Sequence, residues 1–243
     1  MGVLSNRINR DSLRPGDHIY SWRKAYIYAH HGIYVGEDMV IHFTRGQGQE
    51  VGTGTVVDIL LQSSTLNPRN GLCPNCTYED NSHGVVSSCL DCFLAGGSLY
   101  RFEYSVTPAF FLAKARGGTC TCADSDPFDI VIHRATHLLN SGFGCYDIFK
   151  NNCEDFAIYC KTGLITVDDR SIGQSGQAIS FLAAAFSSPW RLATRNAFTV
   201  TAAAIGSIGV YCASRYAADV GRRRDVMKIS VEDLTAKLAA SSI

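Results

Sequence analysis

The segment that begins at Asn151 combines a nucleophilic side chain with the predicted start of a helix. Asn152 is a residue type that caps helices, and Cys153 follows it directly. From Cys153 onward apolar residues recur at helical spacing until Gly163, where a helix is expected to stop. The partial positive charge at a helix N-terminus lowers a cysteine pKa from about 8.5 into the range of about 3.5–7.5, and the resulting thiolate is the reactive form. Cys153 is therefore the candidate nucleophile, and the alternative is a buried cysteine that only packs.

A second group of chemically capable residues is a pair of histidines in a predicted β-hairpin. Because side chains alternate along a strand, His30 and His42 can face the same side and stand next to each other, whereas His31 faces the other side. In that arrangement His30 can take the proton of the Cys153 thiol while His42 fixes the tautomer of His30. The alternative is that both histidines are packing residues.

Four cysteines in the middle of the chain are spaced as metal ligands often are. They form two C-x-x-C units, Cys73 with Cys76 and Cys89 with Cys92. Thiolates at this spacing can close a tetrahedral zinc site. Four thiolates leave no open position on the metal, so the site would be structural and would hold a stretch with too few apolar residues to fold alone. The alternatives are redox-active thiols or unligated cysteines, and Cys120 and Cys122 could join the group.

The elements that must position these groups can be predicted from the sequence pattern. Runs rich in β-forming residues predict strands, and helical spacing after Asp126-Pro127 predicts a helix further along the chain. The predicted strands are 18–22, 26–35, 39–44, 55–60 and 98–104, and the predicted helices of the middle region are 107–114 and 129–139. Strands that come first and helices that come later indicate an α+β fold, with an antiparallel sheet and packed helices.

The C-terminal part of the chain differs in composition. The runs 178–186 and 196–214 are rich in alanine and contain no charged residue, and arginines flank the second run. That run has 19 residues, close to the length of about 20 that spans a bilayer, but it is only weakly apolar. It is a candidate for a helix that spans or lies on a membrane, and the alternative is a helix packed on the main domain. Ser230 and Asp233 form a capping-box pattern that opens a short helix through Ala240.

The composition excludes some classes of function. The chain has 243 residues, and its 22 basic and 22 acidic residues cancel, so the charge balance does not indicate a nucleic-acid partner. Residues 1–17 are polar and contain no apolar run that could serve as a signal peptide. We therefore expect a protein that is not secreted, and that is cytoplasmic or attached to the cytosolic face of a membrane. In a reducing compartment its ten cysteines favour metal binding or catalysis over disulfides.

Three separated motifs make the sequence resemble a known family. They are the opening run Arg14–Asp17, the segment His30–Gly36 with His42 twelve residues after its first histidine, and the later segment Asn152–Phe156. In this order they are similar to the motifs of the lecithin:retinol acyltransferase family. That family includes the HRAS-like suppressor phospholipases and belongs to the NlpC-type, circularly permuted papain-like proteins. The resemblance covers about residues 13–163.

The resemblance implies a division of the chain into two parts. A catalytic domain would occupy residues 1–170, with a Cys-rich insert at about 68–95 that the family pattern does not include. A helical, alanine-rich tail would occupy residues 171–243, with 196–214 as its candidate membrane-associated helix. The implied fold is α+β and permuted papain-like, followed by this tail.

The resemblance also assigns roles to individual residues. It places the catalytic cysteine on Cys153, the general base on His30 and the polarising histidine on His42. The family pattern is a histidine, any residue, a small residue and then the Ile-Tyr-Val/Leu-Gly run, which selects His30 rather than His31. The family has a histidine after its Cys-Glu pair, where this chain has Asp155, and this departure puts the substrate preference in question.

The chemistry implied by the resemblance is acyl transfer on lipid esters through a thioester on Cys153. The partner would be a phospholipid or another acyl-lipid, no cofactor is needed for catalysis, and the Cys153 backbone N–H would contribute to an oxyanion hole. Retinol is not implied as the acceptor, because function belongs to sites rather than to folds. Two alternatives stay open: a thiol amidase or peptidase of the wider superfamily, and a non-catalytic scaffold or regulatory protein that has kept the fold.

Overall fold

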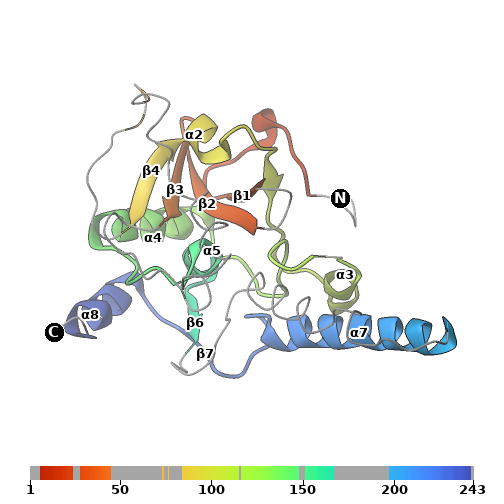
Figure 1. Cartoon of the computed structure of the whole chain (residues 1–243). Helices are drawn as coiled ribbons and strands as arrows, with labels where there is room; N and C mark the ends of the chain where they lie inside the picture. Colours follow the sequence, from red (N-terminus) through yellow and green to blue (C-terminus); the bar gives the residue numbers. More distant parts are fainter. Residues whose placement is uncertain are drawn as a thin grey trace, which may run out of the picture.

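The structure is a computed structural model, and it describes a set of segments with gaps between them. These are residues 6–23, 28–44, 73, 76, 84–114, 116–147, 151–166 and 197–241. Their fold is α+β, as the order of the predicted elements indicated: helices cover an antiparallel sheet (Figure 1). The predicted strand at 55–60 and the alanine-rich run at 178–186 lie outside the described residues.

A five-stranded antiparallel sheet forms the centre of the fold. Its strands, in the spatial order β4-β3-β2-β1-β5, are β4 (Val85–Cys89), β3 (Met39–Phe43), β2 (Tyr28–Gly36), β1 (His18–Arg23) and β5 (Tyr100–Arg101). The predicted hairpin is formed by β2 and β3. Its turn residues Glu37 and Asp38 have φ angles of 51° and 55°, and two positive φ values give a tight turn whose twist matches the strands. This turn sets the register in which Gly32 lies opposite His42.

Different helices cover the two faces of this sheet. On the first face, which we call the α5 face, Ile33 and Ile41 pack against α4 (Phe128–Ser141) and α5 (Cys153–Thr162). On the second face, which we call the α2 face, Val40 packs against the short helix α2 (Leu90–Leu94). Because side chains alternate along β2, His31 lies on the α5 face and His30 on the α2 face.

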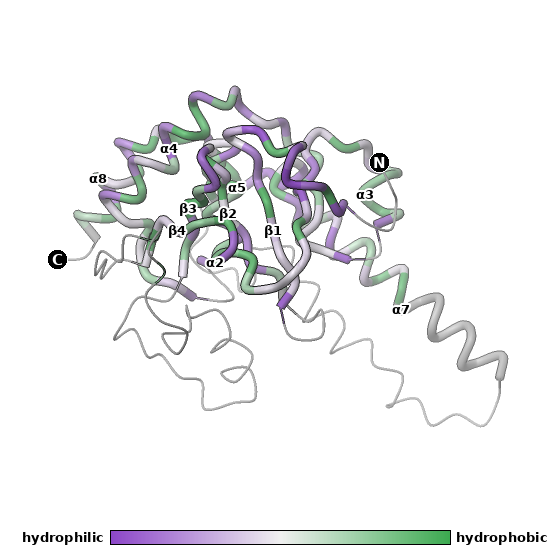
Figure 2. The backbone as a smooth tube through the Cα atoms, turned by 90° about the horizontal axis from the view of Figure 1, so that it is seen from above, coloured by the Kyte–Doolittle hydropathy of each residue, from purple (hydrophilic) through white to green (hydrophobic). Residues whose placement is uncertain are grey.

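Part of the predicted tail belongs to the same folded unit as the sheet. Strand β7 (Val226–Lys228) pairs with β6 (Leu164–Thr166), which follows α5 directly. Helix α8 (Val231–Ser241) lies beside α4 (Figure 2), and its Val231 and Leu234 are buried in the same apolar cluster as α4 and α5. The capping pattern expected at its start is present, because the Ser230 hydroxyl accepts a hydrogen bond from the Asp233 N–H at 3.1 Å.

Helix α7 (Ala197–Ala218) covers the predicted apolar run and contacts the domain near its C-terminal end. It lies beside α3 (Pro108–Ala113) (Figure 1), and the buried Arg215 donates a hydrogen bond to the carbonyl oxygen of Lys114 at 2.6 Å. Ile208 and Val210 of α7 are exposed, at 63 % and 70 %. In contrast to the spanning alternative for residues 196–214, no helix in the described segments is both long and apolar enough to cross a membrane.

Among the elements that differ from the sequence prediction, β5 and β4 have clear physical reasons. The predicted strand at 98–104 shortens to β5, because Glu103 exchanges backbone hydrogen bonds with Thr119 and Thr121 of a following loop instead of with the sheet. Strand β4 was not predicted, since it lies within the Cys-rich stretch and its polar Ser87 and Ser88 weaken the β signal. Both outcomes depend on partners that are distant in sequence.

Candidate active site

Cys153 is the first residue of α5, and the turn before it is built to start a helix. The side chain of Asn152 accepts hydrogen bonds from the backbone N–H groups of Glu154 and Asp155, at 2.8 and 3.3 Å. The Asp155 carboxylate in turn accepts one from the N–H of Asn152 at 3.0 Å, which completes a capping box. This cap fixes the fully buried Cys153 in the first turn, where the partial positive charge of the helix is concentrated.

The same cap gives Asp155 a structural role, at the position where the resemblance leads one to expect a histidine. Burial, and to a smaller extent the neighbouring charge of Glu154, raises the pKa of Asp155 to about 8. At pH 7 the carboxyl is therefore mostly protonated, and it accepts the hydrogen bond from Asn152 through its unprotonated oxygen. The first turn consequently carries less negative charge than two ionised carboxylates would give it.

His30 and His42 lie next to each other on the α2 face of the sheet. The Nε2 of His30 is 2.9 Å from the Nδ1 of His42, and the Nε2 of His42 is 2.9 Å from the Oγ of Ser88 in the edge strand β4. With Gly32 opposite His42, His30 is its diagonal neighbour across the hairpin. Phe93 of α2 packs against both rings, and both histidines are buried. The result is a buried chain of three polar side chains, which we call the His30 chain.

Burial determines the protonation state of the His30 chain. It lowers the pKa of His42 to about 3, with Arg23 as a smaller cause, and it lowers the pKa of His30 well below its ordinary value, with His42 adding to the effect. Both rings are therefore neutral at pH 7.

The hydrogen bonds of the His30 chain also indicate which nitrogen can accept a proton. The Nδ1 of His30 is buried and has no hydrogen-bond partner among the described residues. In one order of donors, the Nε2–H of His30 donates to His42 and the Nε2–H of His42 donates to the Ser88 hydroxyl. The Nδ1 of His30 then carries a lone pair and no hydrogen, which avoids a buried N–H without an acceptor. We assign that order from the network, and it makes His30 Nδ1 the basic atom.

Cys153 lies close to His30 along β2, but its helix packs on the other face of the sheet. The Cys153 Sγ is 3.8 Å from the carbonyl oxygen of Ala29, the residue before His30. The remainder of α5 packs on the face that carries Ile33. Within the described segments, no hydrogen bond joins the Cys153 thiol to the His30 ring. The structure thus brings the two histidines together and places the cysteine beside the adjacent residue.

A second buried histidine network occupies the α5 face. The Nδ1 of His31 is 2.8 Å from the Nε2 of His18, and the Nδ1 of His18 is 2.8 Å from the hydroxyl of Tyr104. Phe102 stacks on the His18 ring and Tyr20 on the His31 ring, with centroids 4.3 and 5.3 Å apart. Burial lowers the pKa of His31 to about 3 and that of His18 well below its ordinary value, to which His31 contributes. We call this group the His31 chain.

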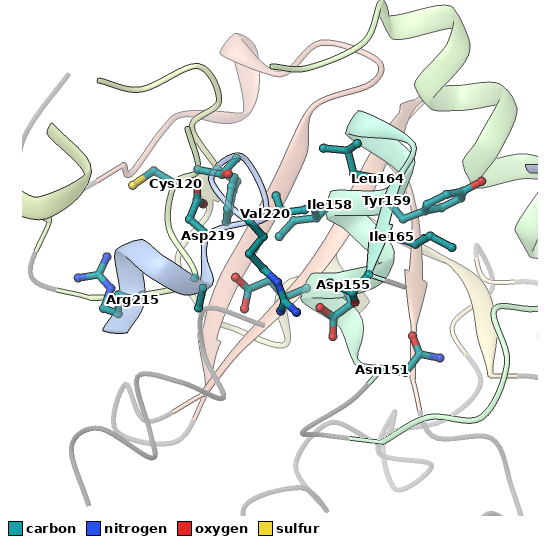
Figure 3. Close-up of a pocket in the computed structure, with 18 of the residues that line it drawn as sticks. Cys120, Asn151, Asp155, Ile158, Tyr159, Leu164, Ile165, Arg215, Asp219 and Val220 are labelled. Carbon is teal, nitrogen blue, oxygen red and sulfur yellow. The ribbon is translucent and has the colours of Figure 1, made fainter. Parts of the chain in front are cut away.

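A cavity of about 310 Å³ lies beside α5, between that helix and the C-terminal end of α7 (Figure 3). Asp155 and Ile158 of α5 line it, together with Arg215 and Asp219 from the end of α7 and the turn after it. Cys153 is not among the lining residues, although the two residues after it are. The first turn of α5 therefore separates this cavity from the strand that carries the histidines.

The four cysteines predicted as metal ligands converge in space. The Sγ atoms of Cys73, Cys76, Cys89 and Cys92 all lie within 4.8 Å of one another, and Cys120 and Cys122 are not part of this group. The Sγ atoms of Cys73 and Cys89 are 3.8 Å apart, which is about the separation of two thiolates on a tetrahedral zinc with Zn–S bonds of about 2.3 Å. Backbone N–H groups of Cys89 and Cys92 donate to the sulfurs of Cys76 and Cys89. This donor set fits a closed structural zinc site.

Ser88 is a site residue that the sequence analysis did not identify. It lies in β4, next to Cys89, and its contact with His42 depends on the pairing of β3 with β4. The run Val85–Cys89 begins with two β-branched residues, which is a weak strand signal. No local pattern, however, indicates that this strand pairs with β3, because about 40 residues separate the two.

The sequence of the chain matches a family model and a curated protein. The model of the family described as lecithin retinol acyltransferase matches residues 11–166. A curated relative, Protein LEAD-SENSITIVE 1 of Arabidopsis thaliana, is 65% identical over 244 residues, which cover 99% of this chain and 93% of the relative. No solved structure matches.

Proposed function

The chain belongs to the lecithin retinol acyltransferase family, and from this premise we propose that it transfers acyl groups from lipid esters through a thioester on Cys153. Family membership itself indicates acyltransferase or phospholipase activity in general. The observation that carries the finer proposal is the His30 chain. Its basic nitrogen is buried and has no hydrogen-bond partner within the described segments, and the Cys153 thiol contacts the carbonyl oxygen of the preceding residue.

The first step forms the thioester. His30 Nδ1 takes the thiol proton of Cys153, and the thiolate attacks the ester carbonyl carbon of the lipid. The carbon–oxygen bond to the leaving alcohol then breaks, and the imidazolium of His30 returns the proton to that alcohol. His42 accepts the Nε2–H of His30 throughout and so keeps the tautomer that this proton transfer requires.

The second step resolves the thioester. Water, an alcohol, an amine or a lysolipid attacks the thioester carbonyl while His30 takes its proton, and the thiolate of Cys153 leaves and recovers a proton from His30. The cap of α5 engages the N–H groups of Glu154 and Asp155, and Cys153 is the first residue of that helix. We propose that the Cys153 N–H contributes to the oxyanion hole.

The proposal requires the thiol and the imidazole to approach each other when substrate binds. Catalytic hydrogen bonds are often long in substrate-free structures and shorten in the complex with substrate. Because the Cys153 thiol already lies beside Ala29, a local adjustment of the first turn of α5 or of the start of β2 would bring it to His30.

The test is the intact mass of the protein after incubation with phosphatidylcholine vesicles. We expect a hydroxylamine-sensitive acyl adduct on the wild type, no adduct on Cys153→Ala, and slow adduct formation on His30→Ala. The exposed Cys145 supplies the matched control, and Cys145→Ala should acylate as the wild type does. An adduct that persists in Cys153→Ala, or that Cys145→Ala abolishes, would contradict the proposed nucleophile.

A second candidate function is a non-catalytic scaffold that keeps the fold. It is favoured by one observation, the packing of α5 on the sheet face opposite the His30 ring. This alternative predicts no adduct with lipid esters of several headgroups and none with a peptide-like thiol probe. Labelling by the peptide-like probe alone would instead identify a thiol amidase or peptidase.

We also propose that the protein meets its lipid at a membrane surface on the cytosolic side. Exposed apolar side chains of α7, Ile208 and Val210, support contact with lipid. The balanced charge of the chain does not indicate a nucleic-acid partner. Sedimentation with vesicles should fall when both residues are replaced by glutamate. Unchanged sedimentation would remove α7 from the lipid contact.

A further inference from the structure

Two helices of the domain carry a second group of metal-ligand side chains, distant from the cysteines. In the described segments the ligand atoms of His133, His137 and Glu232 all lie within 4.8 Å of one another. The Nε2 of His133 is 2.9 Å from the Oε1 of Glu232, and the Nε2 of His137 is 3.2 Å from the Oγ1 of Thr235. Both imidazoles of α4 therefore present their Nε2 atoms to the same helix, α8.

The packing of the two helices explains why these side chains meet. His133 and His137 are one turn apart on α4, so they share one face of that helix. Glu232 lies in the first turn of α8, between the buried residues Val231 and Leu234. Those two apolar side chains pack into the cluster that includes α4. Their burial fixes the first turn of α8 and so the position of the exposed Glu232 carboxylate. The donor atoms are thus brought together by the fold itself.

The donor set selects a class of metal ion. Two imidazoles and one carboxylate suit Zn²⁺, Cu²⁺ or Ni²⁺ rather than Ca²⁺ or Mg²⁺, which prefer oxygen ligands alone. Three protein ligands leave at least one coordination position for solvent. His133 and Glu232 are exposed and His137 is half-buried, so that position faces outward. The four-cysteine group, in contrast, would enclose its metal completely.

We infer that His133, His137 and Glu232 form an open binding site for a zinc-type divalent ion, which joins α8 to α4. The ion replaces the His133–Glu232 and His137–Thr235 hydrogen bonds, because each Nε2 lone pair turns to the metal. Ligands about 2.0–2.1 Å from a tetrahedral zinc stand about 3.3 Å apart, so side-chain rotation without movement of the helices completes the site. Residues 11–166, which match the family model, include α4 but not α8. The ion therefore fastens the C-terminal helix to the family domain.

The test is the binding of Zn²⁺ to the full chain, measured by isothermal titration after its bound metal content has been determined. We expect the wild type to take up one equivalent more than the double variant His133→Ala/His137→Ala, and Glu232→Gln to weaken this uptake at least tenfold. Thr235→Ala is the matched control, because it removes the hydrogen bond to His137 but no ligand. It should bind as the wild type does.

A second measurement does not depend on any variant. Hydrogen exchange of the wild type with and without added Zn²⁺ should show new protection concentrated in α4 and α8. Equal uptake by the wild type and the double variant, or protection confined to β4 and α2 beside the four cysteines, would overturn the inference.

Discussion

His30 and His31 are consecutive residues of one strand, yet they belong to two separate networks on opposite faces of the sheet. Each histidine bonds to a second histidine and, through it, to a hydroxyl: Ser88 for the first and Tyr104 for the second. Each also has one buried ring nitrogen that finds no hydrogen-bond partner in the part of the chain that the structure describes. Composition and connectivity therefore do not distinguish a catalytic chain from a structural one.

The surroundings of the two chains do differ. The His31 chain is enclosed by aromatic rings, with Phe102 stacked on His18 and Tyr20 on His31, and it ends at the half-buried Tyr104. The His30 chain ends at Ser88 on an edge strand, beside the cysteine group. Because the two chains share their composition, a role in catalysis has to be tested by matching substitutions in the His30 chain and in the His31 chain.

The largest expected difference is between His30→Ala and His31→Ala. The first should slow thioester formation by about 10²–10⁴-fold, because it removes the proposed general base. The second should leave the rate per folded molecule close to that of the wild type. It should lower the free energy of unfolding by about 1–3 kcal/mol, since the buried Nε2 of His18 loses its hydrogen-bond partner.

Single-turnover acylation and urea unfolding measure the two effects separately. If His31→Ala abolished acylation while His30→Ala retained it, the base would lie on the α5 face, on the side where the helix of Cys153 packs.

A smaller difference in acylation rate is expected between substitutions of the two hydroxyls that end the chains, Ser88 and Tyr104. Ser88→Ala removes the acceptor of the His42 N–H. The hydrogen bond that orients His42 contributes about 1 kcal/mol, and its loss raises the activation barrier by that amount, which corresponds to a roughly fivefold slower acylation. Tyr104→Phe should reduce stability by a similar amount without changing that rate. Acylation rates measured at equal folded fraction test this pair, and equal rate effects would remove the distinction between the two chains.

The smallest expected difference concerns acid sensitivity, in which the two chains should agree. Burial lowers the pKa of His31 and of His42 to about 3, below the ordinary value of about 6.5 that each has when unfolded. The unfolded chain therefore binds more protons, and stability is full above pH 6.5 and is lost as the pH falls toward 3. His31→Phe and His42→Phe should each reduce the slope of unfolding free energy against pH by up to about 1.4 kcal/mol per unit. An unchanged slope in either variant would show that its histidine titrates normally in the folded state.

Local sequence signals predicted the parts of the site that lie close together in the chain. The two β-rich runs predicted the hairpin of β2 and β3, and Asn152 with Gly163 predicted both ends of α5. The spacing of the cysteines predicted their convergence. In each case a short pattern determines the geometry, because turn, cap and ligand spacing are local properties.

The remaining features depend on pairings between distant segments. Ser88 reaches His42 only because β4 adds to the edge of the sheet, and Glu232 reaches His133 only because α8 packs on α4, 99 residues away in sequence. His133 and His137 form a helical i, i+4 pair in the sequence, but the carboxylate that meets them, Glu232, lies on a helix that is distant in sequence. The assignment of 1–170 and 171–243 as separate parts stays a prediction, although β7 and α8 pack on the first of them.

Ser88 and Cys89 are consecutive in β4, so the end of the His30 chain and a thiol of the cysteine group share a peptide bond. An oxidant such as a peroxide that converts Cys73 and Cys89 to a disulfide must shorten their sulfur separation from 3.8 Å to about 2.05 Å. Because Ser88 precedes Cys89 in β4, a displacement of Cys89 would also displace the hydroxyl that bonds to His42. Oxidation of these thiols is therefore expected to change the alignment of His42 with His30.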